Sequence, residues 1–455
     1  MDISTQKDFR DVFVRMTQTL ELKKGFHDEH REIYEGKRSA KTLAISLPEK
    51  YEAKLRTHLS WGKTAVDTLC NDVDFDGFNN DELGFTRILK TYGAYPAISS
   101  AVRNSMISAC AFVSVLPDSR GVPVYTSYTG REATGIWDSR YGLVVGLAIN
   151  NYTVDPISNL KTVKDYLMFL PGQVLKVSTD GRIIDTFSLP IDRIALVPFV
   201  YNQDPAIKPF GEPRINAAAK NALDAGLRTT KLMEIANDIR LASHNIVSVA
   251  GPQSNGTMDI QNVKSNISSI LVVKTEESNV NSFSLQTPDV SELSTLLSTN
   301  AVNFANAVGM TASAFGFNPE NGSFSSQTLV EMGKPYSNLV RSARRGYGES
   351  IKNLAITSMA VMTGQYNEDF EVISPVFFDS IPSSEIGSVA DGLGKITAIA
   401  PGLDVSAYIK HNILGESVAD AAMTTELPSF EAARKSAEKY AAITTEAQSV
   451  ISGGE

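Results

Sequence analysis

The stretch GFNPENGS, residues 316–323, decides the architecture of this chain, because a helical pattern adjoins it on each side. Before it, from Asp289 to Phe315, apolar residues recur with the spacing of one helix face. After it, a second helical pattern runs from about Ser326 to Met362. Glycine, asparagine and proline between two such patterns favour a loop. The sequence therefore predicts two helices joined by a polar loop.

The second of these helices carries two helix breakers, Gly333 and Pro335. Proline removes one hydrogen bond of a helix and clashes with the carbonyl group four residues earlier. We therefore expect a kink or a break at this point. Beyond it lies a basic segment with Arg341, Arg344, Arg345 and Lys352.

Another long helix is predicted before the loop, from the sequence GEPRI at residues 211–215 to about His244. Pro213 suits the first turn of a helix, where a missing N–H group costs nothing. One stripe of this helix is small: Ala218, Ala219, Ala222 and Gly226. Two short apolar strands follow, at residues 246–249 and 270–273, with a polar segment rich in Gly, Asn and Ser between them.

Residues 1–210 mix helical and strand patterns, which predicts an α+β lobe. Residues 1–33 form an amphipathic helix, which either docks on a neighbouring molecule or packs on its own chain. The Asp180-Gly181 pair between alternating runs predicts a β-hairpin. The remaining predictions are helices at 48–70, 80–92 and 96–106, a turn at 75–78, a buried strand at 110–116, strands and turns at 122–200, a strand at 370–378, and helices at 383–400, 404–414 and 428–449.

Length and composition indicate a folded protein with more than one lobe. The chain has 455 residues, of which 42% are hydrophobic and 20% charged. Its net charge of −9 argues against a general DNA-coating role, which depends on many contacts of Lys and Arg with phosphates. The two cysteines, Cys70 and Cys110, indicate a reduced environment without a disulfide framework. We find no signal peptide and no run of about 18 apolar residues, so neither secretion nor membrane spanning is predicted.

Motifs of known enzyme classes are missing from the sequence. It has no GxxxxGK[ST], no GxGxxG after a strand, no HExxH and no GxSxG. His27 and His30 lie three residues apart among acidic residues, and we expect a solvated helix surface rather than a metal site. The alternating Asp72, Asp74 and Asp76 lack the later ligands of a calcium loop, so a polar turn is expected. The sequence predicts no enzyme, no metal and no cofactor.

The order of local patterns along the chain resembles that of the portal proteins, the head-to-tail connectors, of long-tailed bacteriophages (siphophages). The resemblance covers roughly residues 34–426, and it depends on the order of the patterns, because no single motif is specific. The patterns are Tyr34-Glu35-Gly36, Leu47-Pro48, Trp61 with Val66-Asp67, FDGF at 75–78, SACAFV at 108–113, FGEPRI at 210–215, and the loop followed by the breaker-containing helix.

This resemblance implies an α+β portal fold with the following parts. They are an N-terminal arm (1–33), an α/β wing (34–210), a stem helix (211–245), a small α/β clip (246–287), a second stem helix (288–316), a tunnel loop (317–325), a kinked long helix returning to the wing (326–382), and a helical crown (383–455).

The same resemblance implies a ring, by family a dodecamer, at the portal vertex of a virion assembled in the host cytoplasm. Such a ring conducts double-stranded DNA during packaging and ejection. Its partners would be the terminase large subunit, the major capsid protein and scaffold, and a head-completion or tail adaptor protein. An acidic channel wall would let the duplex slide. Two alternatives stay open: another virion structural protein without a channel, such as a capsid or minor head protein, and an enzyme with a site too diffuse to identify.

The resemblance also selects candidate functional residues. The tunnel loop would place Asn318, Glu320, Asn321, Gly322, Ser323 and Phe324 toward DNA in the channel. Lys334, Arg341, Arg344 and Arg345 are candidates for phosphate contacts or for ion pairs between subunits. Surface ion pairs are the commoner role of such arginines.

Overall fold

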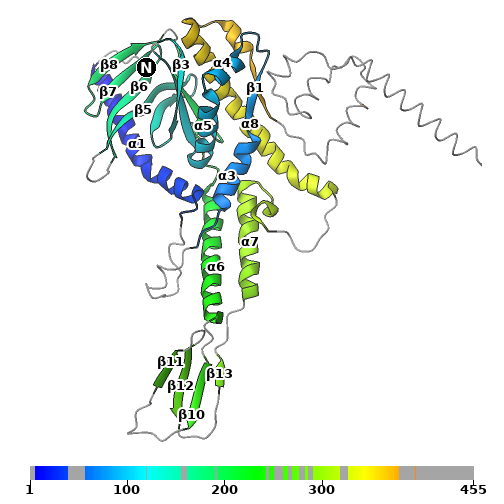
Figure 1. The fold of residues 1–455 in the computed structure, drawn as a ribbon. Helices are drawn as coiled ribbons and strands as arrows, with labels where there is room; N and C mark the ends of the chain where they lie inside the picture. Colours follow the sequence, from blue (N-terminus) through cyan, green and yellow to red (C-terminus); the bar gives the residue numbers. More distant parts are fainter. Residues whose placement is uncertain are drawn as a thin grey trace, which may run out of the picture.

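The structure, a computed structural model, has an α+β architecture that extends from a large body through a helix pair to a small sheet (Figure 1). It describes residues 6–38, 57–118, 120–154, 161–189, 192–241, 245–250, 260–264, 269–275, 282–284, 290–317, 326–378 and 395. The predicted helices at 404–414 and 428–449 lie outside these residues, as does almost all of the helix predicted at 383–400.

Two antiparallel sheets form the centre of the body. The first has the order β4-β5-β6-β7-β8 and the second the order β3-β2-β9. Glycine at position 181, with a φ of +83°, closes the hairpin of β7 and β8, which confirms that prediction. The strands are β2 (Cys110–Pro117), β3 (Pro123–Thr129), β4 (Ala133–Asp138), β5 (Gly142–Val154), β6 (Lys161–Leu170), β7 (Gln173–Ser178), β8 (Ile183–Ser188) and β9 (Leu196–Val200).

Helix α1 (Gln6–Tyr34) packs on the five-stranded sheet of its own chain. Its buried apolar residues recur at the spacing of one helix face, as in Phe9, Phe13 and Met16. They meet one face of the sheet, and the ring of Phe13 lies edge-on to that of Tyr166 at 5.5 Å. The predicted amphipathic helix is confirmed, and its buried side faces its own subunit.

Helices α3 (Trp61–Asp72), α4 (Phe85–Thr91) and α5 (Ala94–Ser108) pack beside the sheets. The helix predicted at 80–92 is shorter than expected. Asp81 precedes the turn at residues 82–83, and its carboxylate accepts hydrogen bonds from the backbone N–H groups of Phe85 (2.6 Å) and Thr86 (2.8 Å). The helix begins only where these donors are satisfied.

The turn predicted at residues 75–78 is wrong. This segment is strand β1 (Phe75–Asn79), which pairs antiparallel with β14 (Ser374–Phe377). Its Asp-Gly pair marks a shift in register between Phe75 and Gly77 instead of a chain reversal. The partner strand lies some three hundred residues away and gives no local signal. The Asp-Gly pair therefore indicated a turn where the chain forms a strand.

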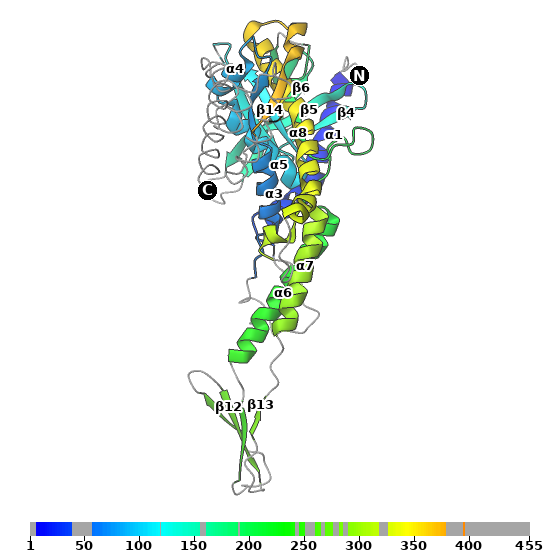
Figure 2. The same cartoon turned by 90° about the vertical axis from the view of Figure 1, so that its right-hand side faces the viewer.

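Helices α6 (Ala217–Leu241) and α7 (Val290–Val308) lie side by side in both views (Figures 1 and 2). Asn300 donates a buried hydrogen bond to the hydroxyl group of Thr229 (3.1 Å) across their interface. Gly226 allows close packing on Trp61, because a Cβ atom there would lie 2.7 Å from the indole ring. The small residue in this stripe therefore has a packing role.

Both helices differ from their predicted bounds. α6 begins at Ala217, after Pro213, since the Asn216 side chain caps it by accepting the Ala219 N–H (2.9 Å). α7 ends at Val308 because Gly309 adopts a φ of +67° and Met310 N–H bonds back to the carbonyl of Ala305. A 3-10 helix, η1 (Ala312–Phe315), completes the segment predicted as one helix.

A four-stranded sheet of order β11-β12-β10-β13 lies beyond the free ends of α6 and α7 (Figure 1). β10 and β12 are parallel, and the other pairs are antiparallel. The two predicted strands are confirmed. The bounds are β10 (Asn245–Ala250), β11 (Ile260–Lys264), β12 (Ser269–Thr275) and β13 (Ser282–Ser284).

Helix α8 (Ser326–Thr363) continues through Gly333 and Pro335 as one element. Of the two alternatives predicted there, a kink or a break, the continuous helix excludes the break, and the kink stays a prediction. The strand predicted at 370–378 is a 3-10 helix, η2 (Glu368–Val372), followed by the short β14. Asn367 favours the 3-10 turn, because its side chain accepts the N–H of Asp369 (3.2 Å).

The solvated surface expected for His27 and His30 is also wrong, since both side chains are buried. Neither ring nitrogen of His27 has a hydrogen-bond partner among the described residues. A Cβ atom at Gly130 would lie 2.5 Å from the His27 ring, so the imidazole packs tightly on the turn before β4. Burial, followed by nearby Lys23, His30 and Arg131, lowers the pKa of His27 from 6.5 to about 4.

This lowered pKa makes stability depend on pH. Below pH 6.5 the unfolded chain binds a proton at His27 that the folded chain refuses until about pH 4, so stability falls as the pH falls between these values. We expect His27 to reduce the free energy of unfolding by about 2 kcal/mol at pH 5 relative to pH 7. Urea unfolding of the His27→Leu variant should lack this loss. A variant of the exposed His58, His58→Gln, should keep it, and an equal loss in His27→Leu would contradict the prediction.

Candidate functional site at helix α8

Helix α8 is buried along its C-terminal half, and its side chains from Lys334 to Arg345 are exposed or partly buried. Tyr347, Ile351 and Leu354 belong to the main core of the body. The Tyr347 hydroxyl group shares a buried hydrogen bond with that of Ser105 (2.7 Å). The other end of the helix projects beyond the body (yellow in Figure 1), and Lys334 is exposed there. The body therefore holds α8 from Tyr336 onward, while the N-terminal end of the helix extends beyond it.

Asp72, the last residue of α3, ties the middle of α8 to the body. Its carboxylate accepts a hydrogen bond from the hydroxyl group of Tyr336. Its backbone carbonyl accepts one from Nε of Arg344 (2.8 Å). Burial, and then the hydrogen bond to Asp72, raises the pKa of Tyr336, so this residue stays a neutral donor. Asp72 thus holds two positions of α8 that lie two helical turns apart.

Arg344 is engaged within its own chain. Besides Asp72, its guanidinium group donates to the backbone carbonyl of Phe378 (3.0 Å) and lies 5.8 Å from the centre of the Phe377 ring. These contacts join α8 to the end of β14. Arg344 therefore has a positioning role in the subunit, and its proposed contact with a phosphate or a neighbouring subunit stays a prediction.

The other predicted basic residues lie on the exposed side of α8. Lys334, Arg341 and Arg345 are exposed, and spacings of seven and four residues place them on one helix face. Neither Arg341 nor Arg345 forms an ion pair with another described residue. These two side chains are thus available for an anionic partner.

The predicted loop residues, Asn318, Glu320, Asn321, Gly322, Ser323 and Phe324, lie outside the described residues. Phe317, just before them, belongs to an aromatic cluster with Trp61 at 6.0 Å between ring centres. Trp61 also contacts Phe304 and Phe315. The segment before α8 therefore starts from a fixed point at the junction of body and helix pair.

Arg214, in the predicted GEPRI motif, is a buried cation at the same junction. Its Nε donates to the carbonyl of Ala65 (3.1 Å), and Nη1 donates to the hydroxyl group of Tyr201 (3.0 Å). Its backbone N–H bonds to the carbonyl of Met106 (2.8 Å). The arginine thus joins α3, α5 and the segment after β9 where the chain enters α6.

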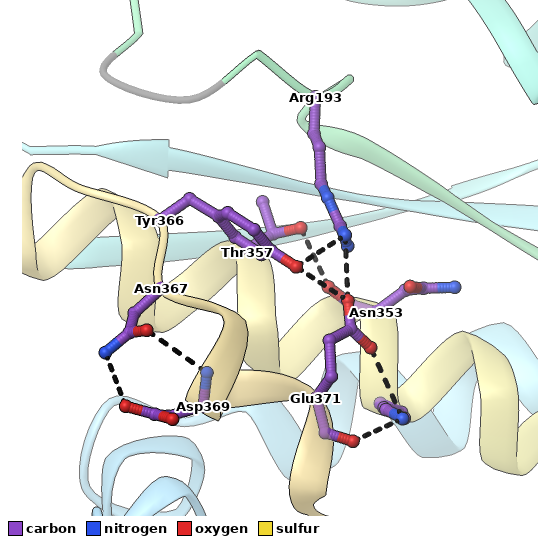
Figure 3. Close-up of polar contacts among 8 residues, drawn as sticks. Arg193, Asn353, Thr357, Tyr366, Asn367, Asp369 and Glu371 are labelled. Carbon is purple, nitrogen blue, oxygen red and sulfur yellow. Dashed lines mark hydrogen bonds and ion pairs between the residues drawn. The ribbon is translucent and has the colours of Figure 1, made fainter.

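A polar cluster that the sequence did not indicate fixes the turn after α8 (Figure 3). Glu371 accepts hydrogen bonds from Arg193 (2.8 Å) and from the Tyr366 hydroxyl group (3.1 Å), and its carboxylate lies 3.3 Å from Nζ of Lys352. Burial, the largest effect, raises the pKa of Glu371, but these donors together lower it. Arg193 comes from a segment far from the other three residues, so no local pattern could have revealed its pairing with Glu371.

A groove of about 980 Å³ opens beside this cluster, between the turn joining β4 and β5 and the C-terminal half of α8. Its lining includes Trp137, Tyr141, Arg193, Glu349 and Asn353. In the described part of the chain, no three His, Cys, Asp or Glu side chains are placed to hold a metal ion. None of the described helices is long and apolar enough to cross a bilayer.

No protein-family model and no curated protein sequence matches this chain. Among solved structures, it is similar to a chain of the virion of a native gene transfer agent particle, with 12% identity and a TM-score of 0.45, over 85% of this chain and 98% of that chain. It is also similar to a chain of the neck of a native gene transfer agent particle computed with C12 symmetry, with 13% identity and a TM-score of 0.46, over 80% of this chain and 93% of that chain. At identities and scores this low, the likeness assigns no function.

The tie at Asp72 can be tested by removing one hydroxyl group. In Tyr336→Phe the Asp72 carboxylate loses a donor in a partly buried place, so the free energy of unfolding should fall by about 1.5–3 kcal/mol. Urea unfolding measures the change. Tyr141→Phe is the matched control, because Tyr141 is exposed and its hydroxyl group makes no hydrogen bond with another described residue. Equal midpoints for both variants would contradict a role of Asp72 in holding α8.

Proposed function

We propose that this chain is a portal protein, which forms a ring at one vertex of a virion and conducts double-stranded DNA during genome packaging and ejection. One observation carries the proposal: the order of elements along the chain follows the order that the sequence resemblance implies. A body, a long helix, a small distal sheet, a returning helix and then a projecting long helix follow one another. This order suits a ring with a central hole.

In this proposal, α6 and α7 form the stem and the distal four-stranded sheet forms the clip. The exposed half of α8 and the segment before it face the channel. Arg341 and Arg345 are exposed there and meet passing phosphates. Because the whole chain carries a net charge of −9, such contacts are few, and the duplex moves instead of binding tightly.

The proposed mechanism needs no covalent chemistry, no metal and no cofactor. The clip docks the terminase large subunit, which supplies ATP hydrolysis, and later a head-completion or tail adaptor protein. The body contacts the major capsid protein and scaffold at the portal vertex, with assembly in the host cytoplasm. The ring is a dodecamer by resemblance to the family.

Imaging of the purified protein tests the proposal directly. Negative-stain electron microscopy should show rings with a central hole, because closed symmetry with one repeated interface encloses an axis. Shells or sheets would favour a capsid or minor head protein. Compact single particles would favour an enzyme. Either result would contradict the portal assignment.

A deletion tests the loop. Removal of residues 320–323 should leave ring formation intact, since the proposal places this segment toward the channel and not between subunits. It should impair DNA packaging or retention, measured as nuclease-protected DNA per particle. A four-residue deletion at 156–159, between β5 and β6, serves as the control and should package normally. Normal packaging by the 320–323 variant would show that the loop is assigned wrongly.

A further inference from the structure

The five-stranded sheet contains a buried carboxylate that three nitrogen atoms approach from the two neighbouring strands. Asp165, on β6, is 2% exposed. Its Oδ1 atom accepts hydrogen bonds from Nδ2 of Asn150 (2.7 Å) and from Nδ2 of Asn151 (3.2 Å), both on β5. Its Oδ2 atom lies 3.7 Å from Nζ of Lys176 on β7. A lysine, an asparagine and a carboxylate therefore converge on one face of the sheet.

The backbone of β5 brings both asparagines to this carboxylate. Asn151 lies opposite Asp165 in the pairing of β5 with β6, and the register shifts on each side of Asn151. Successive side chains of a regular strand point to opposite faces of the sheet. An irregularity of this kind re-aims a side chain, so the neighbouring Asn150 also reaches Asp165. The sheet departs from regular pairing at the point where these groups meet.

Lys176 lies beside Asp165 although another acidic residue stands directly opposite it. In the pairing of β7 with β8, the residue opposite Lys176 is Asp185. No ion pair joins Lys176 to Asp185 in the described part of the chain. The Lys176 side chain is 31% exposed, and its 3.7 Å pair with Asp165 is loose. The amine can therefore move toward the asparagine that shares the same carboxylate.

The position of the carboxylate suits a proton transfer between the two other groups. Oδ2 of Asp165 lies 3.7 Å from the amine of Lys176 and 3.5 Å from the amide nitrogen of Asn151. A carboxylate in this place can take a proton from the amine and give it to the amide nitrogen. Attack of an amine on an amide needs this transfer, because the nucleophile is the neutral amine and the leaving group is ammonia. Holding both groups in one fold makes the reaction intramolecular, which raises its rate.

We propose that Lys176 and Asn151 form an isopeptide bond, with Asp165 as the group that transfers the proton. Nζ of Lys176 gives a proton to the carboxylate and attacks Cγ of Asn151. The Nζ–Cγ bond forms and the Cγ–Nδ2 bond breaks. Of the two protons that Nζ loses, Asp165 carries one to Nδ2, which leaves as ammonia, and the other is released to water. The product joins β5 to β7 across β6, and the inference does not depend on the proposed ring.

The mass of the intact full-length protein tests the bond. After incubation at neutral pH, the wild-type protein should be lighter than its sequence by the mass of one ammonia molecule. A tryptic digest should contain two peptides joined through Lys176 and Asn151, because trypsin does not cut after an acylated lysine. Lys176→Arg and Asp165→Asn should restore the full mass. Lys164→Arg is the matched control, since Lys164 is exposed beside Asp165 in sequence, and it should keep the loss.

Each contrary outcome overturns a defined part of the inference. Full mass in the folded wild-type protein would exclude the bond. A loss of ammonia that persists in Lys176→Arg would come from an asparagine alone and would exclude the lysine as the nucleophile. An equal amount of bond in Asp165→Asn would exclude the proton transfer by Asp165. If Asp165→Asn does not fold, Lys176→Arg still decides whether the bond forms, because its position is partly exposed. The portal proposal is tested separately, by imaging.

Discussion

The hydrogen bonds that Asp72 accepts fix the position of helix α8 on the body. The side chain of this residue accepts from Tyr336, and its backbone carbonyl accepts from Arg344. A hydrogen bond to a charged group contributes about 1.5–3 kcal/mol, which is a large share of the stability of a domain. The core holds the helix from Tyr347 onward, and Asp72 attaches α8 to the body at Tyr336 and Arg344 as well. The direction of the exposed half follows from this attachment.

The helix pair is joined to the body by a second set of charges. Arg38 is almost fully buried and binds both carboxylate oxygens of Asp224 on α6, at 2.6 and 2.8 Å. It also binds Glu29 on α1, which in turn pairs with Lys220. Hydrogen bonds from Lys220 and then Arg38 lower the pKa of Glu29 to about 2. Breaking a buried pair leaves an uncompensated charge, so α1 and α6 hold a defined mutual position.

The sequence predicted those elements whose signals are local. The strand at Cys110–Pro117, the hairpin at Gly181 and the buried side of α1 all follow from periodicity or turn chemistry. Strand β1 was missed because its partner lies near the other end of the described chain. The burial of His27 was missed because charged neighbours on α1 hide its place on the buried face of that helix, seven residues after Leu20.

The candidate site also has features that the sequence could not predict. Arg344 and Arg345 are adjacent in sequence, yet one donates to Asp72 and the other is exposed, since successive residues of a helix point about 100° apart. The composition of the segment cannot tell which of the two arginines is engaged. The position of α3 decides it, because Asp72 is the last residue of α3. The Arg193–Glu371 pair depends in the same way on segments that only the fold brings together.

A cryo-electron microscopy reconstruction of the assembled oligomer tests the central claim most directly. If Asp72 directs α8 toward a channel, the map will place residues 317–325 and the side chains of Arg341 and Arg345 around the symmetry axis, with a bore wide enough for a DNA duplex. A map that places them on the outer rim, or that buries them inside one subunit, would contradict the account.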